Sequence, residues 1–161
     1  MSFDKFIQTR TIARKVILPL VSFPTYNLDS FIDFEADGYL VGVHFMVTHN
    51  ADALGAGAID PTKPSGAIVA KVSGDALTIP AGGNLTNFSG AQILVSHLAF
   101  PDTDGTSSLE SNSRQTTIAY DADSKRIPVK SNDRLGVYLC SNAAASNIEF
   151  AYTLTAYFVR S

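Results

Sequence analysis

Hydrophobic residues along this chain occur in short runs or alternate with polar residues, and clusters of turn-forming residues separate them at fairly regular intervals. Alternation with a period of two is typical of a half-buried β-strand, and many short strands between turns are typical of a sandwich or barrel. The pattern therefore predicts one all-β domain without an internal repeat. The predicted strands are 12–22, 28–35, 39–48, 67–72, 76–79, 91–100, 115–120, 126–130, 135–140 and 148–159.

The first residues of the chain fit the strand pattern less well. We expect an N-terminal arm over residues 1–15 and the β domain over residues 16–161. A helix within residues 3–15 is the alternative, because three apolar residues there would share one helix face. Pro19 lacks a backbone N–H, which predicts that the first strand lies at a sheet edge or contains a bulge.

The last predicted strand is apolar on both of its faces, whereas a strand in a two-layer sandwich needs only one apolar face. Its outer face carries Ala151, Tyr157 and Val159. We therefore expect this face to be covered by a second subunit, an arm or a loop. The candidate subunit-interface residues are Phe150, Tyr152, Tyr157 and Val159.

Strict alternation in the predicted strand 39–48 divides its side chains between two faces. Tyr39, Val41, Val43, Phe45 and Val47 are predicted on one face, and Leu40, Gly42, His44, Met46 and Thr48 on the other.

Charge is distributed unevenly along the chain, although the total is only −3. Residues 1–15 carry four basic side chains and one acid, and residues 16–62 carry six acids and no Lys or Arg. These segments are expected to pair with each other or with a neighbouring subunit. The net charge does not favour nucleic acid as a partner. The candidate arm contacts are Phe3, Phe6, Ile7, Arg10, Arg14 and Lys15.

Enzyme signatures are missing from the sequence. It has no Gly-x-Ser-x-Gly elbow and no phosphate loop ending in Gly-Lys-Ser/Thr, and LGAGAID (54–60) lacks the third glycine of a dinucleotide fingerprint. Asp33 and Glu35 alternate onto one strand face, where carboxylates are ordinarily solvated, and an acid/base pair among the carboxylates of 29–37 is the alternative. We predict that the protein is not an enzyme and uses no cofactor.

Metal ligands are also poorly arranged in the sequence. His44 and His49 are five residues apart, so a continuous strand places them on opposite faces. Residues 102–110 begin like a calcium loop but lack its third ligand, which predicts a polar turn, with a weak cation site as the alternative. Cys140, the single cysteine, is expected to be a small core residue.

Two segments carry a resemblance to known proteins. RIPVKSNDRLGVYLCSN (126–142) followed by IEFAYTLTAYFV (148–159) resembles the closing strands of trimeric jelly rolls. DGYLVGVHFMVTHN (37–50) is similar to the central aromatic strand of complement-type and tumour-necrosis-factor-like heads. The architecture also resembles small jelly-roll virion proteins of tailed phages, and the lack of a collagen-like stalk favours the phage type. The resemblance implies a jelly-roll β-sandwich of about eight to ten strands that forms trimers, and it implies no site residue.

These observations predict a non-enzymatic structural virion protein. It would be a capsid decoration, or cement, protein of a bacteriophage, a homotrimer whose arm binds a major capsid protein. The alternatives are a receptor- or carbohydrate-binding head of a fibre or spike, and a self-assembling jelly-roll shell protein. The chain start lacks the apolar segment of a signal peptide, and the apolar run at 16–21 is shorter than a membrane span. We expect synthesis in the host cytoplasm and no membrane partner.

Overall fold

The computed structural model describes residues 7–19, 26–50, 65–73, 78–79, 91–99, 112–119, 126–140 and 147–161. All ten predicted strands are present in these ranges, with bounds shifted by a few residues. They are β1 (Gln8–Pro19), β2 (Tyr26–Asp33), β3 (Gly38–Asn50), β4 (Ser65–Ser73), β5 (Thr78–Ile79), β6 (Ala91–Ala99), β7 (Asn112–Ala119), β8 (Ile127–Val129), β9 (Asp133–Cys140) and β10 (Asn147–Arg160). The fold is all-β, as the alternation predicted.

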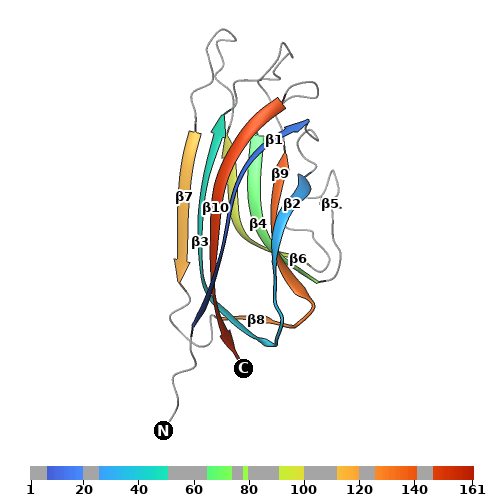
Figure 1. Cartoon of the computed structure of the whole chain (residues 1–161), viewed down its shortest axis with the longest axis vertical. Helices are drawn as coiled ribbons and strands as arrows, with labels where there is room; N and C mark the ends of the chain where they lie inside the picture. Colours follow the sequence, from blue (N-terminus) through green and yellow to red (C-terminus); the bar gives the residue numbers. More distant parts are fainter. Residues whose placement is uncertain are drawn as a thin grey trace.

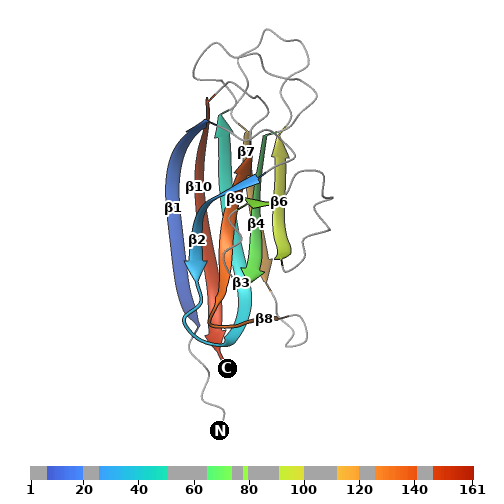
Figure 2. The same cartoon turned by 90° about the vertical axis from the view of Figure 1, so that its right-hand side faces the viewer.

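The strands form two antiparallel sheets that face each other (Figures 1 and 2). Sheet 1 has the order β1-β10-β3-β7, with β8 pairing with β3, and sheet 2 has the order β5-β2-β9-β4-β6. The pairs are nested: β1 lies beside β10, β2 beside β9, β3 beside β7 and β4 beside β6. This nesting of early strands with late ones is the topology of a jelly roll, so the strand order confirms the predicted architecture.

Residues 8–15 correct the predicted arm. They form the first part of β1, which pairs with β10 from Gln8↔Phe158 to Pro19↔Asn147. The arm and the alternative helix are therefore both wrong for residues 8–15, because the unsatisfied edge of β10 provides a strand partner that the local sequence does not show. β1 is an edge strand, as Pro19 predicted. Residues 1–6 lie outside the described part of the chain.

The main core lies between the inner faces of the two sheets. Sheet 1 contributes large side chains from its two central strands, and sheet 2 contributes mainly β-branched and leucine side chains. Fully or almost fully buried members include Val43, Phe45, Val47, Phe150, Leu154, Ala67, Val69, Leu135, Val137 and Leu139. Each strand supplies every second residue, which is the expected geometry for a sandwich core.

A β-bulge in β3 changes the predicted faces of this strand. Tyr157 pairs with Gly42 and Phe158 pairs with Leu40, so Val41 is an extra residue without a partner on β10. The bulge inverts the alternation on its N-terminal side. Leu40 is therefore buried and Tyr39 is 39% exposed, the reverse of the prediction from strict alternation.

The outer face of sheet 2 carries a second buried cluster. Its members are Tyr26, Ile68, Ala70, Val72, Tyr138 and Cys140, each at most 3% exposed in the single chain. Gly66 provides the space for two of them, because a Cβ there would lie 2.6 Å from Tyr26 Oη and 3.1 Å from Cys140 Sγ. The thiol is a core group, as expected, and burial raises its pKa to about 12. This face is thus already covered within one chain.

Asp133 organises the turn between β8 and β9. It is buried, with 7% of its surface exposed. Its carboxylate accepts hydrogen bonds from Lys130 N at 2.9 Å and from Ser73 Oγ at 3.1 Å, and it lies 3.8 Å from Lys71 Nζ. The backbone carbonyl of Asp133 also accepts a hydrogen bond from Phe34 N. One side chain therefore ties the turn to β4.

Replacing Asp133 with Ala should lower the free energy of unfolding by about 1–3 kcal/mol, because a part-buried N–H and a part-buried hydroxyl would lose their acceptor. Urea unfolding followed by circular dichroism measures this change. The control is Lys130→Ala, which removes only an exposed side chain and keeps the backbone N–H. Equal unfolding midpoints for the two variants would contradict this role of the carboxylate.

Candidate assembly surface

The outer face of sheet 1 is open to solvent along β1, β10 and β3. Side chains alternate along each strand, and the pairing register aligns them between strands. The outward residues of the edge strand β1 and of the central strands β10 and β3 therefore form aligned rows. Its described members are Thr9, Thr11, Ala13 and Lys15 on β1, Tyr157, Thr155, Thr153 and Ala151 on β10, and Gly42, His44, Met46 and Thr48 on β3. We call this set the assembly surface.

The assembly surface is polar without being charged. Among its described members, only Lys15 is a lysine, arginine or acid. Met46 is 45% exposed and Tyr157 is 37% exposed, which places two large apolar groups on a face otherwise made of small side chains. Depletion of charge with exposed aromatic and methionine side chains is the composition found at the centre of protein interfaces.

One row of this surface is fixed by hydrogen bonds between side chains. Thr11 Oγ1 lies 3.1 Å from Thr155 Oγ1, and His44 Nδ1 lies 2.8 Å from Thr117 Oγ1 on β7. Cross-strand pairs of this kind hold the side chains in place on a sheet. The row therefore presents an ordered surface, and His44 has a side-chain partner on β7.

A shallow open hollow of about 360 Å³ lies at one end of the assembly surface. It is lined by Ala13, Arg14, Lys15, Met46, Thr48, Ala151, Tyr152 and Thr153. The outward side chains that β10 contributes are the short ones of Ala151 and Thr153, while Met46 and Lys15 lie on the flanking strands. The hollow thus follows from a row of short side chains between longer ones.

Three of the four predicted interface residues do not reach this surface. Phe150 and Tyr152 are 0% and 3% exposed and belong to the core between the sheets. Val159 lies beyond the bulge and is 6% exposed. These three predictions are wrong because the side chains are covered within the chain. Tyr157 does lie on the open face, together with Ala151, Thr153 and Thr155 of the same strand, and sequence reasoning missed Met46 as a member of this face.

A second group of polar side chains closes the edge of the sandwich between β1 and β2. The side chain of Asp29 is 4% exposed. Its carboxylate lies 3.0 Å from Arg14 Nε and accepts a hydrogen bond from Arg14 Nη2 at 3.3 Å. The Tyr152 hydroxyl donates to the same carboxylate and accepts from Ser30 Oγ. Burial raises the pKa of Tyr152 well above its ordinary value, and the bond to Asp29 raises it further. The group links the two sheets and leaves the phenol protonated.

Ion pairs further along this edge explain the uneven charge of the sequence. Arg10 Nη2 lies 3.1 Å from Glu35 Oε1, and Arg134 Nε lies 3.0 Å from Asp33 Oδ1. Asp37 accepts a hydrogen bond from Ser131 N at 3.0 Å. Two of the basic candidates for arm contacts therefore pair within the chain. Ile7 is 60% exposed, and the side chains of Phe3 and Phe6 lie outside the described residues.

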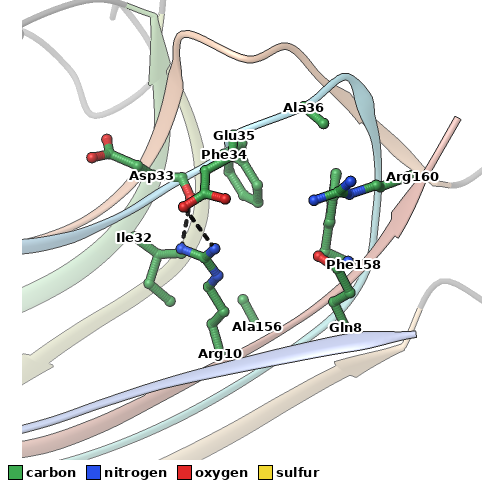
Figure 3. A pocket seen from close by; sticks show the side chains of 10 residues that line it. All are labelled: Gln8, Arg10, Ile32, Asp33, Phe34, Glu35, Ala36, Ala156, Phe158 and Arg160. Atoms are coloured by element: carbon green, nitrogen blue, oxygen red, sulfur yellow. Dashed lines mark hydrogen bonds and ion pairs between the residues drawn. The ribbon is translucent and has the colours of Figure 1, made fainter. Parts of the chain in front are cut away.

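A small cavity lies beside the pair of Arg10 and Glu35 (Figure 3). Its apolar wall comes from Ile32, Phe34, Ala156 and Phe158, and Arg160 points into it from the opposite side. The cavity holds only about 20 Å³, which is room for about one water molecule. It is too small for a metabolite, so it does not compete with the assembly surface as a functional site.

The described residues contain no group of three or more His, Cys, Asp or Glu side chains arranged to hold a metal ion. They also contain no helix long and apolar enough to cross a membrane. The ring of His97 stacks on Phe45 with centroids 5.9 Å apart. The candidate cation loop at 102–110 and the side chain of His49 lie outside the described part of the structure.

Comparisons with known proteins add the following. No protein-family model matches the chain, and neither does any curated protein. Among solved structures, the fold is similar to part of dimeric latent PorU from Porphyromonas gingivalis, with 11% identity and a TM-score of 0.46, and the match spans 98% of this chain but only 13% of PorU. It is similar to Eiger TNF from S. frugiperda, with 8% identity and a TM-score of 0.40 over 85% of this chain and 92% of that one. It is also similar to the decameric BFDV capsid protein, with 13% identity and a TM-score of 0.35 over 97% and 100% of the two chains. At TM-scores this low the similarities do not bear on function.

The two arginines on β1 provide a matched pair of substitutions. Arg10→Ala removes a pair between exposed side chains and should cost at most about 1 kcal/mol of unfolding free energy. Arg14→Ala leaves the buried Asp29 carboxylate without its cation and should cost about 2–4 kcal/mol. Urea unfolding of both variants at low ionic strength measures the difference. Equal losses would show that the burial of Asp29 does not decide the strength of its pair.

Proposed function

We propose that this protein is a non-enzymatic structural protein of a virion, a capsid decoration protein that associates with itself as a trimer and attaches to a major capsid protein. The jelly roll supplies a rigid body, because two sheets share one continuous core. The polar groups of the β1–β2 edge pair with one another, which suits a structural role. The partner, the phage origin and the number of copies are parts of this proposal.

The contrast between the two outer faces is the observation that carries the proposal. The centre of the outer face of sheet 2 is covered by the chain itself, with Ile68 and Tyr138 fully buried, and Phe31 on β2 is 39% exposed with the Arg134 guanidinium over its ring. The assembly surface is open, nearly uncharged and carries Met46 and Tyr157. A soluble subunit that leaves such a face in water gains by covering it with another protein. The proposed occupant is a second copy of the chain.

Attachment to a shell is assigned to the residues before β1. Ile7 is exposed, and residues 1–7 carry two phenylalanines and one lysine. Seven residues reach at most about 25 Å when extended. Because β1 begins at Gln8, this segment is shorter than the arm expected from the sequence, and Arg10 and Arg14 do not belong to it.

The purified protein should have a mass of about 52 kDa, three times the 17.2 kDa of one chain, in light scattering at micromolar concentration. Tyr157→Lys should shift the mass towards the monomer, because it places a charge on the buried surface. Ser131→Lys, in the exposed turn after β8, is the control and should leave the mass unchanged. A stable monomer of the unmodified protein would contradict self-association. Particles formed by the purified protein alone would instead indicate a shell protein.

Deleting residues 1–7 should leave the β-type circular dichroism and the mass per chain of the complex unchanged, because the deletion stops before β1. It should lower attachment to the parent particle, measured by co-sedimentation. Attachment of the intact protein should also decrease with added salt if Lys5 contributes, since salt screens exposed charges. Equal co-sedimentation of the intact and shortened proteins would contradict the role of this segment, and retention on a glycan column would favour a carbohydrate-binding head.

A further inference from the structure

The hollow at the end of the assembly surface has the form of a socket. Ala13 and Lys15 on β1 pair with Thr153 and Ala151 on β10, which in turn pair with Met46 and Thr48 on β3. The two alanines and Thr153 form a low middle, and the longer side chains of Met46 and Lys15 stand at its sides. The hollow is open to solvent and holds about 360 Å³, which is ample for one aromatic side chain.

The same surface carries a projecting side chain that is displaced from the hollow. Tyr157 is 37% exposed, and its partner on β3 is Gly42, which has no side chain to stand beside the ring. Tyr157 follows Thr153 by four residues and Ala151 by six, which corresponds to about 13 Å and 20 Å along an extended strand. The ring of Tyr157 therefore cannot fill the hollow of its own chain.

We propose that the hollow lined by Ala13, Met46 and Ala151 binds the Tyr157 side chain of a neighbouring copy of this protein. This inference rests on the proposed function and names the site through which the copies associate. The alanines would contact the ring face, the Met46 thioether would contact its edge, and Thr48 and Lys15 lie where the phenol oxygen needs polar partners.

Two properties of the surface favour a second copy as the occupant. The projection and the hollow lie at different positions on one chain, so each copy can present its Tyr157 to one neighbour and its hollow to another, as the head-to-tail contacts of a trimer require. The face has one lysine among its described members, so two copies do not repel each other strongly.

A charge exchange within one chain tests the contact. Tyr157→Glu and Ala151→Lys should each lower the association constant at least about tenfold, because each buries an unpaired charge. The double variant should recover most of this loss at low ionic strength, because every Glu at 157 would meet a Lys at 151 of the next copy. The two positions are about 20 Å apart within a chain, so recovery cannot come from pairing within it.

The control combines Tyr157→Glu with Ser131→Lys, which restores the net charge without placing a lysine in the hollow. Mass is measured by light scattering at low and high salt, with circular dichroism to verify folding. The proposed binding of Tyr157 in the hollow is supported if only the combination of Tyr157→Glu with Ala151→Lys restores the oligomer mass, and if high salt abolishes this restoration. Oligomers that tolerate Ala151→Lys, or that no double variant restores, would overturn the socket while leaving self-association intact. A monomeric unmodified protein would overturn the proposed self-association itself.

Discussion

The structure depends on the position of β10 in the middle of sheet 1, where it pairs with β1 on one side and β3 on the other. Its inward residues, among them Phe150 and Leu154, pack against sheet 2, and its outward residues form the centre of the assembly surface. Since successive side chains of a strand point to opposite faces, both sets are fixed by one register. A shift by one residue would exchange the core and the surface.

The nested strand order places the two ends of the described chain side by side, and β1 begins where β10 ends (Figure 1). It also leaves an edge of the sandwich between β1 and β2, which belong to different sheets. Arginines on β1 and carboxylates near β2 occupy this edge. The ion pair of Arg14 and Asp29 is more buried than the pair of Arg10 and Glu35. The Asp29 carboxylate also accepts a hydrogen bond from the Tyr152 hydroxyl. Charge on an edge strand further disfavours pairing with foreign strands.

The outer faces of the two sheets differ in how much of their surface is exposed to solvent. Sheet 2 is apolar on both faces in β4 and β9, and both faces are buried within one chain. Sheet 1 keeps an outer face of threonine, alanine, methionine and tyrosine in solvent. Met46 and Tyr157 are the large side chains that this face exposes.

The sequence by itself determined the ten strands, their approximate bounds and the single all-β domain, because a period of two is a local property of each strand. It also indicated that a strand near the C-terminus has two apolar faces. Which face is covered, and by what, was decided by the tertiary structure. In β3 the bulge at Val41 buries Leu40 and leaves Tyr39 exposed, and a bulge depends on the partner strand as well as on its own sequence. The ion-pair partners of Arg10 and Arg14 likewise depend on the tertiary structure, because an ion pair requires two side chains to lie close together in space. β1 and β2 lie close together because of how the two sheets stack.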